Sequence, residues 1–106
     1  MREMLTKKEW SKALKRMNIS GHYLEYAYNK ENHFTVSMND PYKGIKLWFP
    51  SHLHEWNKNN TIQQLYHEAF HVLVWDMSVH RLRADKDYEY KEDATADHFA
   101  QFMYPV

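Results

Sequence analysis

The chain has 106 residues, of which 43% are hydrophobic and 26% charged, a composition typical of a globular protein with one core, so we expect a single domain over residues 1–106. The formal net charge is zero, which argues against a nucleic-acid partner, because such proteins depend on clustered positive charge. The chain has no cysteine, so disulfides and cysteine-based sites are excluded and any metal must be bound by His and carboxylates.

The first half of the chain predicts one helix followed by three strands. Apolar residues recur at helical spacing after a capping box at Thr6–Glu9. Alternating and aromatic-rich segments then favour strands, and the short turn at residues 30–32 predicts that the first two strands pair antiparallel. The helix is expected over residues 6–18 and the strands over residues 22–29, 34–38 and 44–49.

The second half predicts two helices separated by loops. Residues 51–60 are polar and are expected to form a loop, and a second capping box at Thr61–Gln64 opens a helix through about Ser78. After a charged loop over residues 80–87, a last helix is expected over residues 90–103. The fold class is therefore α+β, in the order αβββαα, with a small antiparallel or mixed sheet packed against helices. No segment is long and apolar enough to cross a membrane or to act as a signal peptide, so we expect a cytoplasmic protein without a membrane partner.

One pentapeptide on the second predicted helix carries chemistry: His67-Glu68-Ala69-Phe70-His71. Residues four apart share a helix face, so both imidazoles can reach one metal ion at about 2.0–2.1 Å. The motif His-Glu-x-x-His on a helix indicates a Zn²⁺ site, with Glu68 as the general base that acts on a zinc-bound water. The competing interpretation is structural, with both histidines as ordinary, partly buried residues of a core helix.

A pair of carboxylates on the last predicted helix supports the metal site. Asp93 and Asp97 are one turn apart on one face, where a third ligand and an outer carboxylate would lie. The outer carboxylate would accept the free N–H of a ligand histidine and fix its tautomer. The alternative is an acidic first turn that only complements the helix dipole.

These residues resemble the ImmA/IrrE-like branch of the gluzincin metallopeptidases. In that family the helical His-Glu-x-x-His is followed by a pattern close to Glu-x-x-Ala-(Asn/Asp)-x-Phe-Ala, and often by Met and Pro. The corresponding segments here are Asp93-Ala94-Thr95-Ala96-Asp97-His98-Phe99-Ala100 and Phe102-Met103-Tyr104-Pro105. The match covers about the last 45 residues. It implies a minimal zincin-like domain with His67 and His71 as metal ligands, Glu68 as general base and Asp97 in the outer acidic position.

The chain departs from the family pattern at the third ligand. The glutamate of the family aligns with Asp93, whose side chain is one methylene shorter, while the actual glutamate, Glu92, lies one position earlier. Asp93 keeps the helical phase of Asp97, whereas Glu92 has the usual length but differs in phase by about 100°. We favour Asp93 as the third ligand, with Glu92 as the alternative.

A hydrolytic site also needs a group that stabilises the oxyanion beside the metal. The nearby candidates are Tyr88, Tyr90, His80 and His98, although each type is more often a surface or packing residue. The third predicted strand precedes the active helix, as the substrate-aligning edge strand does in zincins, so we expect an extended peptide to add to it. Residues 52–55 also contain two histidines but are expected to form ordinary surface.

Two functions follow from these features. The first is a zinc-dependent metallopeptidase that hydrolyses peptide bonds of a protein or peptide substrate. The second is a zincin-like metal-binding protein that acts as a protein-binding or regulatory module without proteolysis, which the small size favours because no second subdomain closes a cleft. Glu68 favours the first, since a structural zinc site has no need of a general base.

Overall fold

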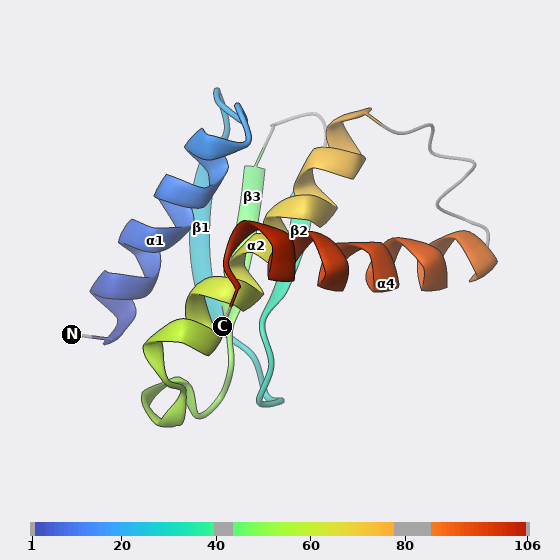
Figure 1. The fold of residues 1–106 in the computed structure, drawn as a ribbon. Coiled ribbons are helices and arrows are strands. Elements are labelled where there is room, and N and C mark those ends of the chain that lie inside the picture. Colours follow the sequence, from blue (N-terminus) through green and yellow to red (C-terminus); the bar gives the residue numbers. More distant parts are fainter. Residues whose placement is uncertain (1, 40–43, 78–85, 106) are drawn as a thin grey trace.

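The computed structural model describes residues 2–39, 44–77 and 86–105. Helices and a small mixed sheet follow one another in the order αβββαα (Figure 1), which confirms the predicted α+β class. The elements are α1 (Arg2–Arg16), β1 (Tyr23–Tyr28), β2 (Thr35–Asn39), β3 (Gly44–Phe49), the 3-10 turn η1 (Leu53–Glu55), α2 (Lys58–Met77) and α4 (Lys86–Met103). The loop predicted over residues 51–60 therefore contains a 3-10 turn and the start of α2, and most of the loop predicted over residues 80–87 lies outside the described residues.

The order of strands in the sheet is β1-β3-β2. β3 pairs in parallel with β1, with Tyr26 opposite Leu47, and antiparallel with β2, with Val36 opposite Leu47. The prediction that the first two strands pair with each other is therefore wrong, and so is the prediction that the third strand is an edge. The physical reason is burial: β3 carries three fully buried apolar side chains, and a central strand is the position that removes them from water. These side chains are Ile45, Leu47 and Phe49.

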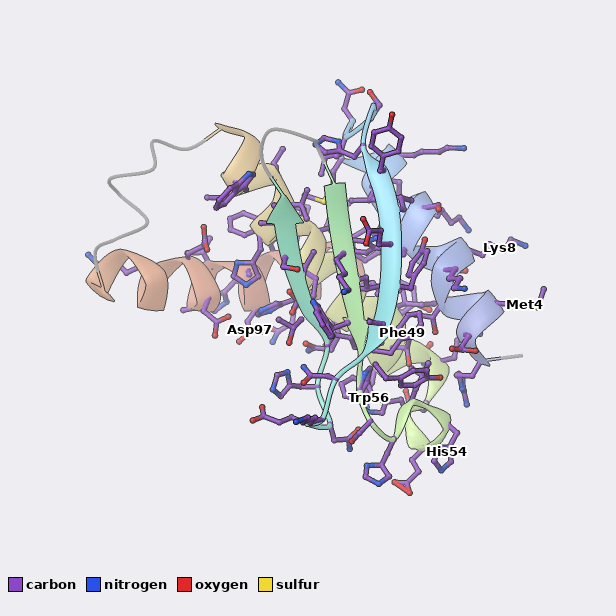
Figure 2. All side chains as sticks on the ribbon, turned by 180° about the vertical axis from the view of Figure 1, so that it is seen from behind. Met4, Lys8, Phe49, His54, Trp56 and Asp97 are labelled. Carbon is purple, nitrogen blue, oxygen red and sulfur yellow. The ribbon has the colours of Figure 1, made fainter. Side chains whose placement is uncertain are left out.

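The helices lie together on one face of the sheet (Figure 1). Seen from behind, the opposite sheet face is not covered by any helix among the described residues (Figure 2). The core fills the space between the sheet and the helices. Its fully buried members include Trp10 on α1, Leu47 on β3, and Leu65, Ala69 and Val72 on α2. Burying a Leu or Val side chain stabilises the fold by about 1.5–3 kcal/mol, so this stripe fixes the rotation of α2 about its axis.

Both predicted capping boxes are wrong, because each helix begins about one turn earlier than its threonine. The Thr6 hydroxyl donates to the carbonyl of Arg2, 2.8 Å away, and the Thr61 hydroxyl donates to the carbonyl of Asn57 at the same distance. A hydroxyl bonded to the carbonyl four residues earlier is a feature of a helix interior. The actual cap of α2 is Asn57, whose Oδ1 accepts the backbone N–H of Asn60 at 2.7 Å.

Candidate metal centre

Packing between α2 and α4 brings the histidines of α2 close to the carboxylates of α4. Ala96 and Ala100 are buried on the inner face of α4, and their small side chains allow the two helix backbones to approach closely. The rings of Phe70 and Phe99 pack at a centroid distance of 5.3 Å on the same interface. The phase that these contacts impose on α4 also turns Asp93 and Asp97 towards α2, because residues three and four apart share a helix face.

Three donor atoms converge between the helices. Nε2 of His67 lies 3.1 Å from Nε2 of His71 and 3.1 Å from Oδ1 of Asp93, and Nε2 of His71 lies 3.4 Å from the same carboxylate oxygen. Tetrahedral ligands at about 2.0–2.1 Å from a zinc ion are separated by about 3.3 Å. His67, His71 and Asp93 therefore form a group that can hold a metal ion, with the spacing of one face of a tetrahedron.

The outer nitrogens of both rings face carboxylates. Nδ1 of His67 lies 2.7 Å from Oδ1 of Asp97, and Nδ1 of His71 lies 3.0 Å from Oε2 of Glu92. A carboxylate can only accept, so both rings carry their proton on Nδ1 in the state in which their Nε2 atoms are free to bind a metal ion. The two acidic residues between which the sequence left the third ligand open thus have different places: Asp93 is in the donor group, and Glu92 lies behind His71.

The charge pattern of the donor group fits a cation. With the ring protons on Nδ1, the two Nε2 atoms present lone pairs to each other and to the Asp93 oxygen. Three lone-pair donors within 3.4 Å repel one another unless a positive charge lies between them. Two imidazoles and a carboxylate are the donor types that zinc takes in hydrolytic sites, where one coordination position stays open.

Glu68 lies beside this group and is almost completely buried, with 6% of its surface exposed. Burial raises its pKa to about 8, and the negative charges of Asp93 and Asp97 add to the shift. A bound cation would oppose these charges and lower the pKa again. In the protein without a bound cation, Glu68 is therefore a carboxyl group that can change protonation state near neutral pH, which is the property of a general base or acid.

A cavity of about 570 Å³ opens onto these residues. One wall contains Glu68 and the donor group. The opposite wall comes from β2 and the residues just before it, including the apolar side chains of Val36 and Met38. The strand that lines the cavity beside the donor group is thus the edge strand β2, not the third strand that the sequence predicted.

Of the predicted oxyanion-stabilising residues only His98 has a described side chain, and His98 does not line the cavity. His98 is exposed on α4, while His80 and the side chains of Tyr88 and Tyr90 lie outside the described part of the structure. The cavity is instead lined by His33, which the sequence analysis did not single out. Only its position at the entrance to a strand marks it in the sequence, and the strand order that brings it to α2 is not visible there.

No protein-family model, curated protein or solved structure matches this chain. Among the described helices, none has the length and apolar character needed to cross a membrane.

Proposed function

We propose that this protein is a zinc-dependent metallopeptidase that hydrolyses peptide bonds of a protein substrate. The observation that carries the proposal is the position of Glu68, a buried carboxyl that shares a cavity with His67, His71 and Asp93. The likeness of residues 67–71 and 93–100 to the ImmA/IrrE-like pattern also supports it. When bound, a zinc ion supplies a Lewis acid that polarises a carbonyl and acidifies a water.

The side chains of the site have two other roles, proton transfer and positioning of the histidine rings. Glu68 takes the proton from the attacking water and passes it to the leaving amine, so it acts first as base and then as acid. Asp97 and Glu92 hold the histidine rings through the Nδ1 contacts at 2.7 and 3.0 Å. Such outer contacts fix the ring orientation and make the facing nitrogen a better donor.

The edge strand β2 is the natural binding site for an extended peptide. It pairs with β3 and with no other described strand, so its second edge can accept the main chain of a substrate by strand addition. Val36 and Met38 line the cavity along this strand and favour an apolar side chain next to the bond that is cleaved.

The test uses untagged wild-type protein, Glu68→Gln and, as a matched control, Glu55→Gln at an exposed glutamate outside the cavity. Bound zinc is measured by elemental analysis, and cleavage is measured with unfolded protein substrates. We expect about one zinc per chain in all three proteins, cleavage by the wild type and Glu55→Gln, and none by Glu68→Gln.

Two results would contradict the proposal. If none of the proteins retains zinc after loading, the metal centre is wrong. If all three retain zinc and none cleaves, the protein-binding or regulatory function without proteolysis takes its place.

A further inference from the structure

A second group in the cavity has the properties of a catalytic hydrogen-bond donor. Besides the metal ligands and Glu68, the polar residues of the lining in the described part of the chain are His33, Thr35, Gln64 and Asp97. Of these only His33 can carry a positive charge. The metal ligands and their carboxylates come from α2 and α4, whereas His33 precedes β2 and so belongs to the opposite wall.

A closed ring of hydrogen bonds fixes the imidazole of His33. Its Nε2 faces a carboxylate oxygen of Glu31, and the backbone N–H of Glu31 donates to Oδ1 of Asn29 at 3.3 Å. Nδ2 of Asn29 donates to the hydroxyl of Thr35 at 3.1 Å, and that hydroxyl lies 3.1 Å from Nδ1 of His33. Although the side chain of His33 is about half exposed, its orientation is therefore set by its neighbours.

The same turn is anchored to the rest of the fold. The backbone N–H of Asn29 donates to the carbonyl of Phe49 at 2.8 Å, and that of Ser51 donates to the carbonyl of Glu31 at 2.9 Å. The ring of Phe34 packs edge-on against Trp56 at a centroid distance of 5.1 Å, and Figure 2 shows Trp56 close to the base of the sheet. The turn is thus a rigid mount for the ring, as a site residue requires.

The two ring nitrogens of His33 face different surroundings. The partners of Nδ1 are the carbonyl of Phe34, at 3.2 Å, and the Thr35 hydroxyl, at 3.1 Å, and both residues line the cavity. The partner of Nε2 is Glu31, which does not line it. Nδ1 is therefore the nitrogen whose partners belong to residues of the cavity lining, whereas Glu31, the partner of Nε2, does not belong to that lining.

The ring has partners in both protonation states. As a cation it donates from Nε2 to Glu31 and from Nδ1 to the Phe34 carbonyl. As a neutral ring it keeps the proton on Nε2, and Nδ1 accepts the Thr35 hydroxyl. The hydrogen bond to Glu31 raises the pKa of His33 above its usual value, and the Phe34 carbonyl contributes in the same direction. Glu68, Asp93 and Asp97 are the other titratable groups that share the cavity with it outside the histidine ligands.

We propose that His33 is a catalytic residue whose Nδ1–H binds the substrate carbonyl oxygen as it becomes negatively charged, and that Glu31 is its positioning residue. A negatively charged oxygen is a stronger acceptor than the carbonyl and hydroxyl that Nδ1 meets at more than 3 Å. No covalent bond to His33 forms or breaks in this step; Nδ1–H exchanges its contacts within the protein for a hydrogen bond to the substrate oxygen. The inference rests on the proposed peptidase function.

The experiment measures ligand affinity of the zinc-loaded protein, separately from its activity. The probe is a phosphinic pseudo-dipeptide with apolar side chains, whose tetrahedral anion has the charge and shape of the hydrated peptide bond. The reference is a hydroxamate with the same side chains, which binds zinc without that anion. We compare wild type, His33→Ala, Glu31→Gln and the matched control His54→Ala, which removes an exposed histidine next to a glutamate outside the cavity.

We expect His33→Ala to weaken phosphinate binding by roughly 10- to 100-fold, the effect of one charge-assisted hydrogen bond, with little change for the hydroxamate. His54→Ala should bind both probes as the wild type does. In Glu31→Gln, the NMR titration of the His33 ring should shift to lower pH. Phosphinate binding by this variant should then weaken at a lower pH than in the wild type.

Two outcomes would overturn the inference, and they are distinguishable. If the wild type binds both probes and His33→Ala binds them equally well, His33 has no such role and the peptidase function stands. If the wild type binds zinc but neither probe, the proposed function fails as well. A thermal melt of each variant shows whether it is folded.

Discussion

Replacing Asp93 by Asn tests the donor group directly, because the change keeps the side-chain shape and removes the charge. The whole apparent binding free energy of a four-ligand zinc site is about 10–16 kcal/mol, so one ligand is worth about 3 kcal/mol, or roughly a hundredfold in affinity. Glu92→Gln is the matched control. Glu92 contacts Nδ1 of His71 at 3.0 Å, and loss of an outer contact of this kind costs about 10- to 100-fold at most.

The affinities translate into thermal shifts. With free zinc at about 100 times the wild-type Kd, binding stabilises the wild type by about 2.7 kcal/mol, and a hundredfold weaker variant by about 0.4 kcal/mol. The difference corresponds to roughly 10 °C in Tm for a domain of this size. At a tenfold loss of affinity, Glu92→Gln would keep about 1.4 kcal/mol of the stabilisation.

The assay is differential scanning fluorimetry with and without zinc, together with competition against a chelating dye for Kd. In the presence of EDTA, Asp93→Asn should melt no lower than the wild type, since it removes one of the charges beside Glu68. A larger loss of zinc affinity in Glu92→Gln than in Asp93→Asn would refute the assignment of Asp93 to the donor group.

Three further predictions concern Glu68, the core and the helix cap. Because the folded, metal-free protein raises the pKa of Glu68 from 4.5 to about 8, the wild type should lose stability relative to Glu68→Gln as the pH rises through this window and should level off above it. Urea unfolding in EDTA at pH 5 and pH 8.5 measures this, and a pH-independent difference would contradict it. Leu65→Ala, at a fully buried position on α2, should cost about 2–5 kcal/mol of unfolding free energy; a cost near zero in urea unfolding would mean that the α2 stripe is not packed as described. Asn57→Ala should cost about 1 kcal/mol through loss of the α2 cap, measured as a drop in Tm, whereas Asn60→Ala, which keeps the backbone N–H that Asn57 accepts, should cost much less.

The sequence alone determined which side chains share a face of a helix, because the helical period is a local property of the chain. The apolar stripe of α2 and the four-residue spacing of His67 and His71 both follow from 3.6 residues per turn, so the side chains that share a face could be predicted without knowing what they pack against. The same holds for Asp93 and Asp97 on α4. The boundaries were less accurate, because Thr6 and Thr61 have the chemistry of capping residues but bond to carbonyls inside their helices.

Only the tertiary structure decided which segments meet. The strand order β1-β3-β2 depends on how much apolar surface β3 buries compared with its two neighbours. The sequence of one segment alone does not show which strand will be central. This order makes β2 a wall of the cavity and places His33 in the same cavity lining as the donor group. The phase of α4 against α2 likewise places Asp93, rather than Glu92, in the group that could hold a metal ion. Backbone geometry fixes the pattern within a segment, whereas contacts between segments distant in sequence fix the site, because those contacts depend on the packing of the whole core.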